Sequence, residues 1–249
     1  MKQLEHALPS PAECLAADEA LLDRCEAGHG DELLAFWEPR ETFVVVGYAN
    51  KISTEVNLAA CRERNIPVFR RCSGGGTVVQ MPGGLNYSLI LRITETGPTR
   101  NISAANEFIM DKNRAAMQAA IGQPEPVVSV RGHTDLTLTT TAPAPVTLKF
   151  AGNAQRRRKH FLLFHGTLLI DCKLQLISEL LQMPSLQPDY RHSRAHEDFV
   201  TNLNLPVAKV KAALTQAWGA NEVWTQPPLD EITRLAESKY LTDDWNYKF

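Results

Sequence analysis

A run of three glycines constrains this chain of 249 residues more than any other feature. Gly74, Gly75 and Gly76 stand in the sequence Arg-Arg-Cys-Ser-Gly-Gly-Gly-Thr-Val. Because glycine has no Cβ, backbone N–H groups in such a turn can approach a ligand closely and surround an anion. Arg71 adds a guanidinium group, whose paired N–H donors can bind a phosphate or a carboxylate, and Ser73 adds a hydroxyl donor. A triple-glycine turn alone is more often a simple turn than a ligand-binding loop, so the residues around it must distinguish the two.

Hydrophobic patterning predicts strands on both sides of the glycine run. Residues 43–47 and 66–70 before the run, and 77–80 and 85–93 after it, form short apolar or alternating segments. No Gly-Lys-Ser/Thr follows the glycines and the GxGxxG spacing is missing, which excludes a P-loop and a Rossmann fingerprint. The run is therefore expected to be a strand-to-strand turn of another kind.

Helix signals bracket this strand-rich region. Ser10 is followed by proline and, three residues on, by glutamate, a capping pattern that predicts a helix from Ser10 to about Gly28. Strands and helices intermix without strict βαβ alternation, which favours an α+β fold with a mixed or antiparallel sheet flanked by helices. Further strands are expected near 127–130, 136–140, 146–150 and 167–171, and further helices at 55–64, 102–121, 173–181, 206–218 and 229–237.

Two segments are predicted to be irregular. The Thr/Ala/Pro segment 137–145 is typical of a hairpin tip or a mobile loop. Residues 189–198 are charged and polar, and Pro188 argues against a helix that would bring His192 and His196 together as metal ligands. We interpret the second segment as a solvated loop near the entrance for an acceptor.

Composition excludes several classes of partner. A formal net charge of -2 gives no electrostatic basis for binding nucleic acid or an anionic membrane. No apolar run approaches membrane-spanning length, and the N-terminus lacks a signal-peptide profile. The five cysteines are scattered, which suits reduced thiols better than a disulfide framework. We therefore expect a soluble, cytoplasmic protein with a single domain over residues 1–249.

A second segment carries candidate chemistry. Lys149 ends a strand-like run and precedes the small residues Gly152 and Ala154, and the sequence His-Gly-Thr-Leu-Leu begins at His165. A lysine in this place could bridge a carboxylate and an α-phosphate, and would neutralise negative charge in a transition state. On spacing alone, a solvent-facing lysine at a strand end is the simpler interpretation.

Together the two segments resemble the biotin/lipoate protein ligase family, and within it the lipoate–protein ligase A family. The resemblance extends in the same order to residues 15–21, 44–50, 132–136 and 200–203, and so covers nearly the whole chain. It implies a catalytic domain with the biotin/lipoate ligase fold, which is similar to class II synthetases. It also implies activation of lipoate by ATP to lipoyl-AMP, followed by transfer of the lipoyl group to a lysine of a carrier domain.

The resemblance assigns roles at matched positions. Lys149 and Arg71 would stabilise charge at the mixed anhydride, and Asp135 would help to hold Mg²⁺. The apolar walls for the lipoyl chain would come from Val44 and Val46, with Val78 beside them. The remaining contacts to lipoate and the adenylate are expected from Ser73, Gly74, Gly75, Gly76, Thr77, Asn86, Gly152, Ala154, Arg156, His165 and Gly166.

The resemblance also implies partners. ATP, Mg²⁺ and lipoate would bind, and the acceptor would be a lipoyl carrier domain, either the acyltransferase subunit of a 2-oxoacid dehydrogenase or a glycine-cleavage H-like protein. The basic residues 157–159 are either a solvated surface or a contact for an acidic carrier. Many ligases of this family carry a C-terminal accessory domain. We expect none in this chain, so a separate polypeptide could supply that role.

Octanoyltransferases share this scaffold but use a cysteine acyl-enzyme and no ATP, and they are the main alternative. One expected cysteine position is occupied by residues 131–134, which contain no cysteine, and only Cys172 lies near the other. Cys72, beside Arg71, is interpreted as a small filler, although a basic neighbour could lower its pKa. The absence of a well-placed nucleophile favours the ligase. A non-catalytic lipoate-binding subunit is a further alternative.

Overall fold

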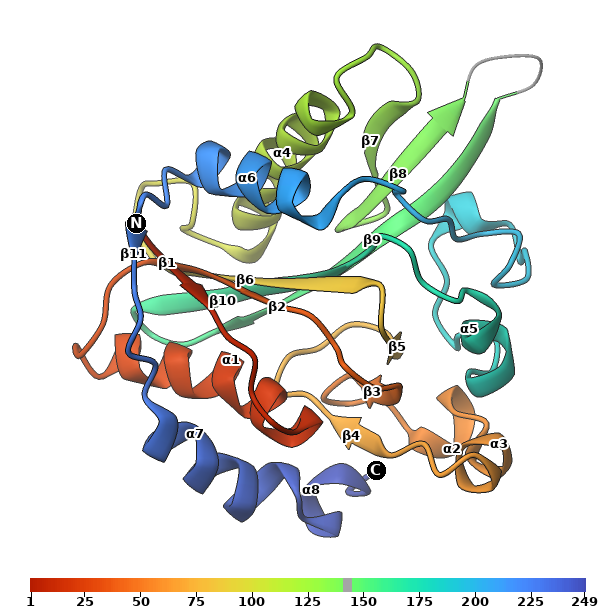
Figure 1. The fold of residues 1–249 in the computed structure, drawn as a ribbon, viewed down its shortest axis with the longest axis horizontal. Coiled ribbons are helices and arrows are strands. Elements are labelled where there is room, and N and C mark those ends of the chain that lie inside the picture. The colour runs from red at the N-terminus through yellow and green to blue at the C-terminus, as the bar shows by residue number, and fades with distance from the viewer. Residues whose placement is uncertain (141–144) are drawn as a thin grey trace.

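An eight-stranded mixed sheet spans the molecule and carries helices on both faces (Figure 1). The computed structural model describes residues 1–140 and 145–249. The first three strands of the sheet pair in parallel and the others pair antiparallel, which confirms the α+β fold with a mixed sheet. The strand order is β11 (Glu222–Val223), β1 (Lys2–Glu5), β2 (Leu33–Trp37), β6 (Gly84–Arg92), β10 (Phe161–Leu169), β9 (Val146–Arg157), β8 (Asp135–Thr140) and β7 (Val127–Arg131).

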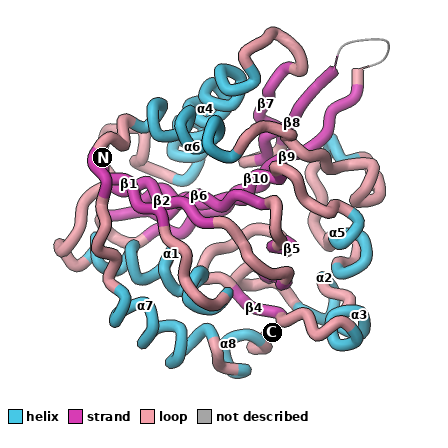
Figure 2. The backbone as a smooth tube through the Cα atoms, in the orientation of Figure 1, coloured by secondary structure: helices cyan, strands magenta, loops and turns pink. Residues whose placement is uncertain are grey.

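A small three-stranded sheet lies beside the large one (Figure 2). Its central strand, β3 (Phe43–Val46), pairs in parallel with β4 (Val68–Arg70) and antiparallel with β5 (Val78–Gln80). The glycine run joins β4 to β5, as the strand predictions required. This connection brings the end of the small sheet against the middle strands of the large one.

Helices form layers above and below the large sheet in Figure 1. The longest helix occupies the predicted residues and ends at Gly122, whose φ of 78° lies in the left-handed region that glycine tolerates. One face carries α4 (Ile102–Ile121) and α6 (Val207–Trp218), and the other carries α1 (Pro11–Glu26) and α7 (Leu229–Leu235), followed by a π-helical turn (Ala236–Tyr240) and α8 (Asp243–Asn246). Beside the small sheet lie α2 (Ile52–Glu55), α3 (Leu58–Glu63) and α5 (Gln175–Leu180).

The helix α1 begins as its capping pattern predicts. Ser10 Oγ accepts a hydrogen bond from the backbone N–H of Glu13 at 3.2 Å, and donates one to the Glu13 carboxylate at 2.7 Å. These two bonds fix the start of α1, and the start of the helix sets which of its side chains face the candidate site.

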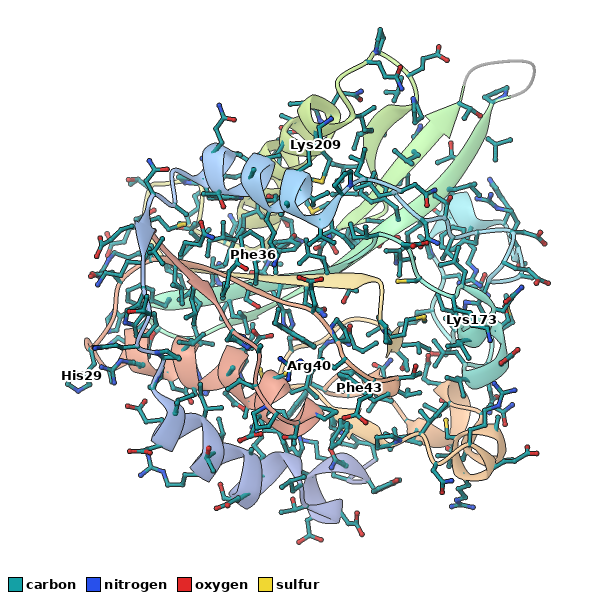
Figure 3. The ribbon with its side chains drawn as sticks, in the orientation of Figure 1. His29, Phe36, Arg40, Phe43, Lys173 and Lys209 are labelled. Atoms are coloured by element: carbon teal, nitrogen blue, oxygen red, sulfur yellow. The ribbon has the colours of Figure 1, made fainter. Side chains whose placement is uncertain are left out.

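The main core lies between the large sheet and the helices α4 and α6. Phe36, Phe150 and Phe164 from the sheet pack in one buried cluster with Ile109 and Met117 from α4. Figure 3 shows Phe36 in this interior and Lys173 on the surface. Burial of such side chains is the dominant favourable contribution to folding.

Several elements differ from their predictions. Strands β9 and β10 are longer than expected, because small residues such as Gly152 and Gly166 remain in the hydrogen-bonded ladder instead of ending it. The helix expected at 55–64 is two short helices, since Asn57 caps the second through the N–H of Ala60. Strands β1, β2 and β11 and the helix α8 were not predicted.

The segment expected to be a hairpin tip divides at the end of β8. Residues 137–140 continue that strand, and residues 141–144 lie outside the described residues. In the parts of the chain that the structure describes, no helix is long and apolar enough to cross a membrane.

Candidate active site

A cavity of about 840 Å³ lies where the two sheets meet. Strands of both sheets, the helix α1 and the segment 182–200 contribute to its walls. Eleven of the predicted site residues line it, so segments far apart in the sequence do come together in one place. These residues are Arg71, Gly75, Gly76, Thr77, Asn86, Asp135, Lys149, Gly152, Ala154, His165 and Gly166.

Arg71 shapes the glycine run. Its Nη2 donates to the carbonyl oxygens of Gly74 at 2.5 Å and Gly76 at 2.7 Å, and its Nε donates to Ser73 Oγ at 3.0 Å. Burial lowers the pKa of Arg71 to about 10, which still leaves the guanidinium charged at neutral pH. No carboxylate of the described residues forms an ion pair with it. The loop therefore presents a buried positive charge to the cavity.

Only one of the three glycines requires glycine for conformational reasons. Gly75 has a φ of +83°, and a Cβ there would lie 3.0 Å from Arg71 Nη2. A Cβ on Gly74 would have no neighbour within 4 Å. The carbonyl of Gly75 also packs closely on Gly47, where an added Cβ would lie 2.1 Å from that oxygen. Gly75 is thus the position that fixes the loop.

A hydrogen-bonded chain links the glycine run to the large sheet. Ser73 Oγ lies 2.5 Å from His165 Nε2, and His165 Nδ1 lies 2.6 Å from Asp18 Oδ2. Ser88 on the neighbouring strand donates to the other oxygen of Asp18. These contacts orient the imidazole at the cavity wall. Ser73 itself is buried behind the loop and does not line the cavity.

Asp18 was not predicted. It lies three residues after Leu15 and four before Leu22, both of which are buried in the core. A carboxylate at this spacing has to face the interior, where it needs polar partners. That spacing is the signal that could have found it.

Lys149 points into the cavity and is held by a carboxylate. Its Nζ lies 2.8 Å from Asp135 Oδ1, and Tyr190 Oη donates to Asp135 Oδ2 at 2.8 Å. A Cβ on Gly152 would come within 2.9 Å of Lys149 Nζ, so this glycine leaves room for the lysine. Burial raises the pKa of Tyr190, which keeps its hydroxyl protonated as a donor. The solvent-facing interpretation of Lys149 is therefore wrong.

The Mg²⁺ role expected for Asp135 stays a prediction. The described residues contain no group of three or more histidine, cysteine or acidic side chains that could hold a metal ion. One carboxylate together with substrate phosphates is an ordinary Mg²⁺ site, so Asp135 fits that chemistry. Both of its oxygens are engaged, and Lys149 would have to leave Oδ1 first.

Two predicted wall residues do not line the cavity. Val44 and Val46 are fully buried in a cluster with Val79 and Leu169, and the cavity wall comes from Val45, Val79 and Leu169 instead. Side chains alternate between the two faces of a strand, so the wall residue of this strand is Val45 and not its neighbours Val44 and Val46. Val78, the third expected wall residue, does line the cavity.

The structure places Arg156 behind the glycine run instead of at the nucleotide side of the cavity. Its Nη1 donates to the carbonyl of Cys72 at 2.5 Å, and its Nη2 lies 3.7 Å from Glu19. The rest of the basic run is also engaged within the chain: Arg158 pairs with Asp23 at 2.7 Å. Gly74 likewise does not line the cavity. These contacts with α1 oppose a carrier-binding role for the run.

None of the cysteines lines the cavity, and all five are buried. Burial, with help from Glu19 and Asp18, raises the pKa of the Cys72 thiol to about 12. Burial also raises the pKa of Cys172 to about 11. Neither sulfur is a thiolate near neutral pH, and neither reaches the cavity. Cys72 therefore behaves as a buried filler.

Replacing Cys72 by alanine should leave the rate of acyl transfer within about two-fold of the native rate. The expected cost is a loss of stability of roughly 1 kcal/mol from the removed sulfur. Alkylation by iodoacetamide between pH 7 and 9 should also be slow in the folded protein, because the thiolate forms only as the pH approaches its raised pKa of about 12. Rapid alkylation that abolishes activity, in a protein whose unfolded control reacts at the ordinary rate, would contradict this assignment.

Residues 189–198, predicted to be a solvated loop, contain no α-helix or strand and are mostly exposed, but two of their side chains are buried. Arg191 is 4% exposed and His196 is 9% exposed, and both line the cavity. The guanidinium groups of Arg191 and Arg194 lie over the ring of Phe199, at 4.7 Å and 5.2 Å from its centroid. Cation–π stacking lets a polar sequence fold inward, and hydrophobic patterning gives no sign of it.

The comparisons with known proteins agree with this geometry. Residues 10–219 match the family described as the lipoyl protein ligase A/B catalytic domain. Octanoyltransferase LipM of Geobacillus kaustophilus is 26% identical to the chain, over 96% of this chain and 94% of that protein.

Two solved structures share the fold. A bipartite lipoate protein ligase from Thermoplasma acidophilum, described with its E2 lipoyl domain, gives a TM-score of 0.77 at 20% identity and covers 99% of this chain and 95% of its own. Lipoate-protein ligase A bound with ATP gives 0.75 at 22% identity, with 99% of both chains covered. These identities support the fold alone. Since the family match covers most of the chain, this protein belongs to the lipoyl protein ligase A/B catalytic domain family.

Proposed function

We propose that this chain transfers a lipoyl or octanoyl group to a lysine of a lipoyl domain. Membership of the family supports acyl transfer, and the relatives named as octanoyltransferases support octanoyl as well as lipoyl as the group transferred. The bipartite ligase described with its E2 lipoyl domain supports a lipoyl domain as acceptor and a separate accessory subunit. The cavity is lined by charged residues such as Arg71 and Lys149 and by apolar ones such as Val78 and Leu169, which suits a medium-length acyl chain with a reactive carbonyl.

The acyl donor in this proposal is an acyl adenylate, and the observation that carries it is the cavity lining. Arg71, Lys149, Gly75 and Gly76 line the cavity, whereas none of the cysteines does. A thioester intermediate needs an accessible thiolate. An adenylate is already activated, so the protein needs only to orient it and to stabilise charge. The ligase A structure bound with ATP supports a nucleotide in this fold.

The transfer step requires little from the protein beyond position and charge. The amine of the acceptor lysine attacks the acyl carbonyl, a C–N bond forms, the bond to the AMP oxygen breaks, and the amine proton passes to solvent. Lys149 and Arg71 would stabilise the negative charge that develops on the carbonyl and phosphate oxygens. When bound beside Asp135, Mg²⁺ would offset triphosphate charge during adenylation.

Octanoyl transfer from a thioester, without ATP, is the second candidate, and the name of the LipM relatives favours it. With no cavity-lining cysteine, the acceptor lysine would attack the donor thioester directly. A third possibility is a non-catalytic subunit that binds lipoate and leaves chemistry to a partner.

One pair of reactions tests these candidates. The purified protein is mixed with a lipoyl domain and either lipoate, ATP and Mg²⁺, or an octanoyl thioester without ATP. The adenylate proposal expects pyrophosphate release and an acylated domain, read by mass spectrometry, in the first reaction only. Acylation in the second reaction alone would establish the thioester donor. Use of preformed lipoyl-AMP but not ATP would place adenylation on an accessory subunit, and no acylation in any arm would contradict the function.

A further inference from the structure

The cavity contains a second buried arginine that has no acidic partner. Arg191 Nε donates to the carbonyl of Arg194 at 3.0 Å, and Nη2 lies 3.7 Å from Met183 Sδ. Within residues 1–140 and 145–249, no carboxylate lies within 4 Å of its guanidinium, and Nη1 has no hydrogen bond. Most of this cation has lost contact with water without gaining a counter-ion, which is costly.

Two other arginines of the chain, buried Arg70 and half-buried Arg194, are compensated differently. Arg70 donates to the carbonyl oxygens of five residues, and Arg194 donates to four carbonyl oxygens. Those networks explain the two residues as structural. Arg191 makes one such bond, and it faces a cavity. Its hydrogen-bonding capacity is therefore directed at something that enters the cavity.

Among the described residues, none of the carboxylates that line the cavity forms an ion pair with Arg191. Asp135 is already bound by Lys149 and Tyr190. Glu55 also lines the cavity, but its carboxylate accepts from the Ser185 hydroxyl. Asp189 lines the cavity as well, exposed and without an ion pair to Arg191 among the described residues.

His196 does not supply a counter-ion either. Burial lowers its pKa, and the positive charges of Arg191 and Lys149 contribute to the lowering, so the ring is neutral at pH 7. Asp135 pairs with Lys149 and acts on Arg191 only at longer range, so Arg191 has no ion-pair partner of its own among the described residues. This part of the cavity is therefore suited to an anion.

We propose that Arg191 is a binding site for a phosphate group of the acyl donor. Lipoate and octanoate each have a single anionic group, and the reacting carbonyl derived from it belongs beside Arg71 and Lys149. A second anion must therefore come from the group that leaves. This inference rests on the proposed acyl transfer and deepens it, because it names the chemistry by which the donor is recognised.

Two kinds of donor carry such a phosphate. One is a nucleotide, as in ATP and an acyl adenylate, and the other is a thioester whose thiol belongs to a phosphopantetheine arm. Both present a phosphate beyond the reactive carbonyl, and a guanidinium binds either one through paired N–H donors. The experiment below distinguishes the two.

Binding measurements on matched probes test the site without any need for turnover. Affinities are measured by calorimetry for ATP against adenosine, and for octanoyl phosphopantetheine against octanoyl pantetheine. In the native protein one pair should show a preference for the phosphate-bearing member of roughly 100-fold or more. Arg191→Gln should reduce that preference by roughly 10- to 100-fold, the range for a lost charged hydrogen bond, and should leave the phosphate-free probe unchanged.

Matched variants control for charge and for folding. Arg131→Gln removes an exposed cation that does not line the cavity, and should keep the full preference. If Arg191→Gln also weakens binding of the phosphate-free probe, Arg191→Lys separates a folding defect from a lost phosphate contact. It keeps the charge and should recover part of the preference for phosphate. The nucleotide pair alone responding identifies a nucleotide donor, and the thioester pair alone responding identifies a phosphopantetheine donor.

Two results would overturn the assignment: no phosphate preference in the native protein for either pair, or an unchanged preference in both Arg191 variants. Either result is independent of the acylation assay. If the protein transfers acyl groups but the Arg191 variants bind phosphate as the native protein does, only the phosphate site is wrong. If the protein prefers phosphate-bearing probes but acylates nothing, the proposed function is wrong and the phosphate site stands.

Discussion

Replacing Lys149 by methionine should slow acyl transfer by about 10²- to 10³-fold, the loss typical of removing one preorganised group that stabilises transition-state charge. Methionine keeps much of the apolar stem and removes only the ammonium. The side chain lies in the cavity 2.8 Å from Asp135, and its backbone is held on both sides by Phe199 and Thr201. The strand should therefore keep its position, and the loss should appear in kcat more than in the KM for the acyl donor.

Lys173→Met is the matched control, because Lys173 is exposed and lies outside the cavity (Figure 3). It should retain the native rate. Thermal unfolding of both variants checks the fold: the partly exposed Lys149 ion pair contributes on the order of 1 kcal/mol or less. A Lys149→Met protein that transfers acyl groups at the native rate would remove Lys149 from the mechanism.

Replacing Gly75 by alanine should reduce acyl transfer by about 10²-fold. The left-handed backbone at φ +83° disfavours any residue with a Cβ by roughly 1–2 kcal/mol, and the added carbon would press on Arg71 Nη2 at 3.0 Å. The loop and the guanidinium that shapes it would both shift. A displacement of about 1 Å in a positioning group can cost about 10²-fold in rate.

Gly74→Ala separates this conformational effect from a general sensitivity of the loop. Its Cβ would meet no atom within 4 Å, and Gly74 does not have a positive φ. The variant should keep activity within about three-fold and unfold at the native temperature. Equal activity of the two alanine variants would show that the loop geometry does not determine the rate.

The sequence was sufficient for the parts of the site that the family resemblance covers. The triple-glycine turn after arginine and the lysine before small residues each had a simpler structural interpretation, and only together did they indicate ligand binding. The face of the strand that meets the cavity was harder to predict. Residues 43–47 are wholly apolar, so the pattern could not tell Val45, which lines the cavity, from Val44 and Val46. An alternating strand would have fixed the face.

Other site residues depend on contacts that no local pattern records. Asp18 reaches His165 across 147 positions of sequence, and Tyr190 reaches Asp135 across 55. Arg191 is buried through stacking on Phe199, so its charge gave the opposite expectation. Strand β2 was missed although its residues are fully buried, because nothing in its short run Leu-Leu-Ala-Phe-Trp distinguishes a strand from a helix.

A crystal structure of the protein with lipoyl-AMP tests the central claim most directly. We expect the mixed anhydride to lie against the glycine run, with Lys149 Nζ moved from Asp135 to the carbonyl or phosphate oxygens and with Arg71 unchanged in its bonds to the loop. The compound bound elsewhere, or bound in this cavity with Lys149 still paired to Asp135 and away from the anhydride, would contradict the account.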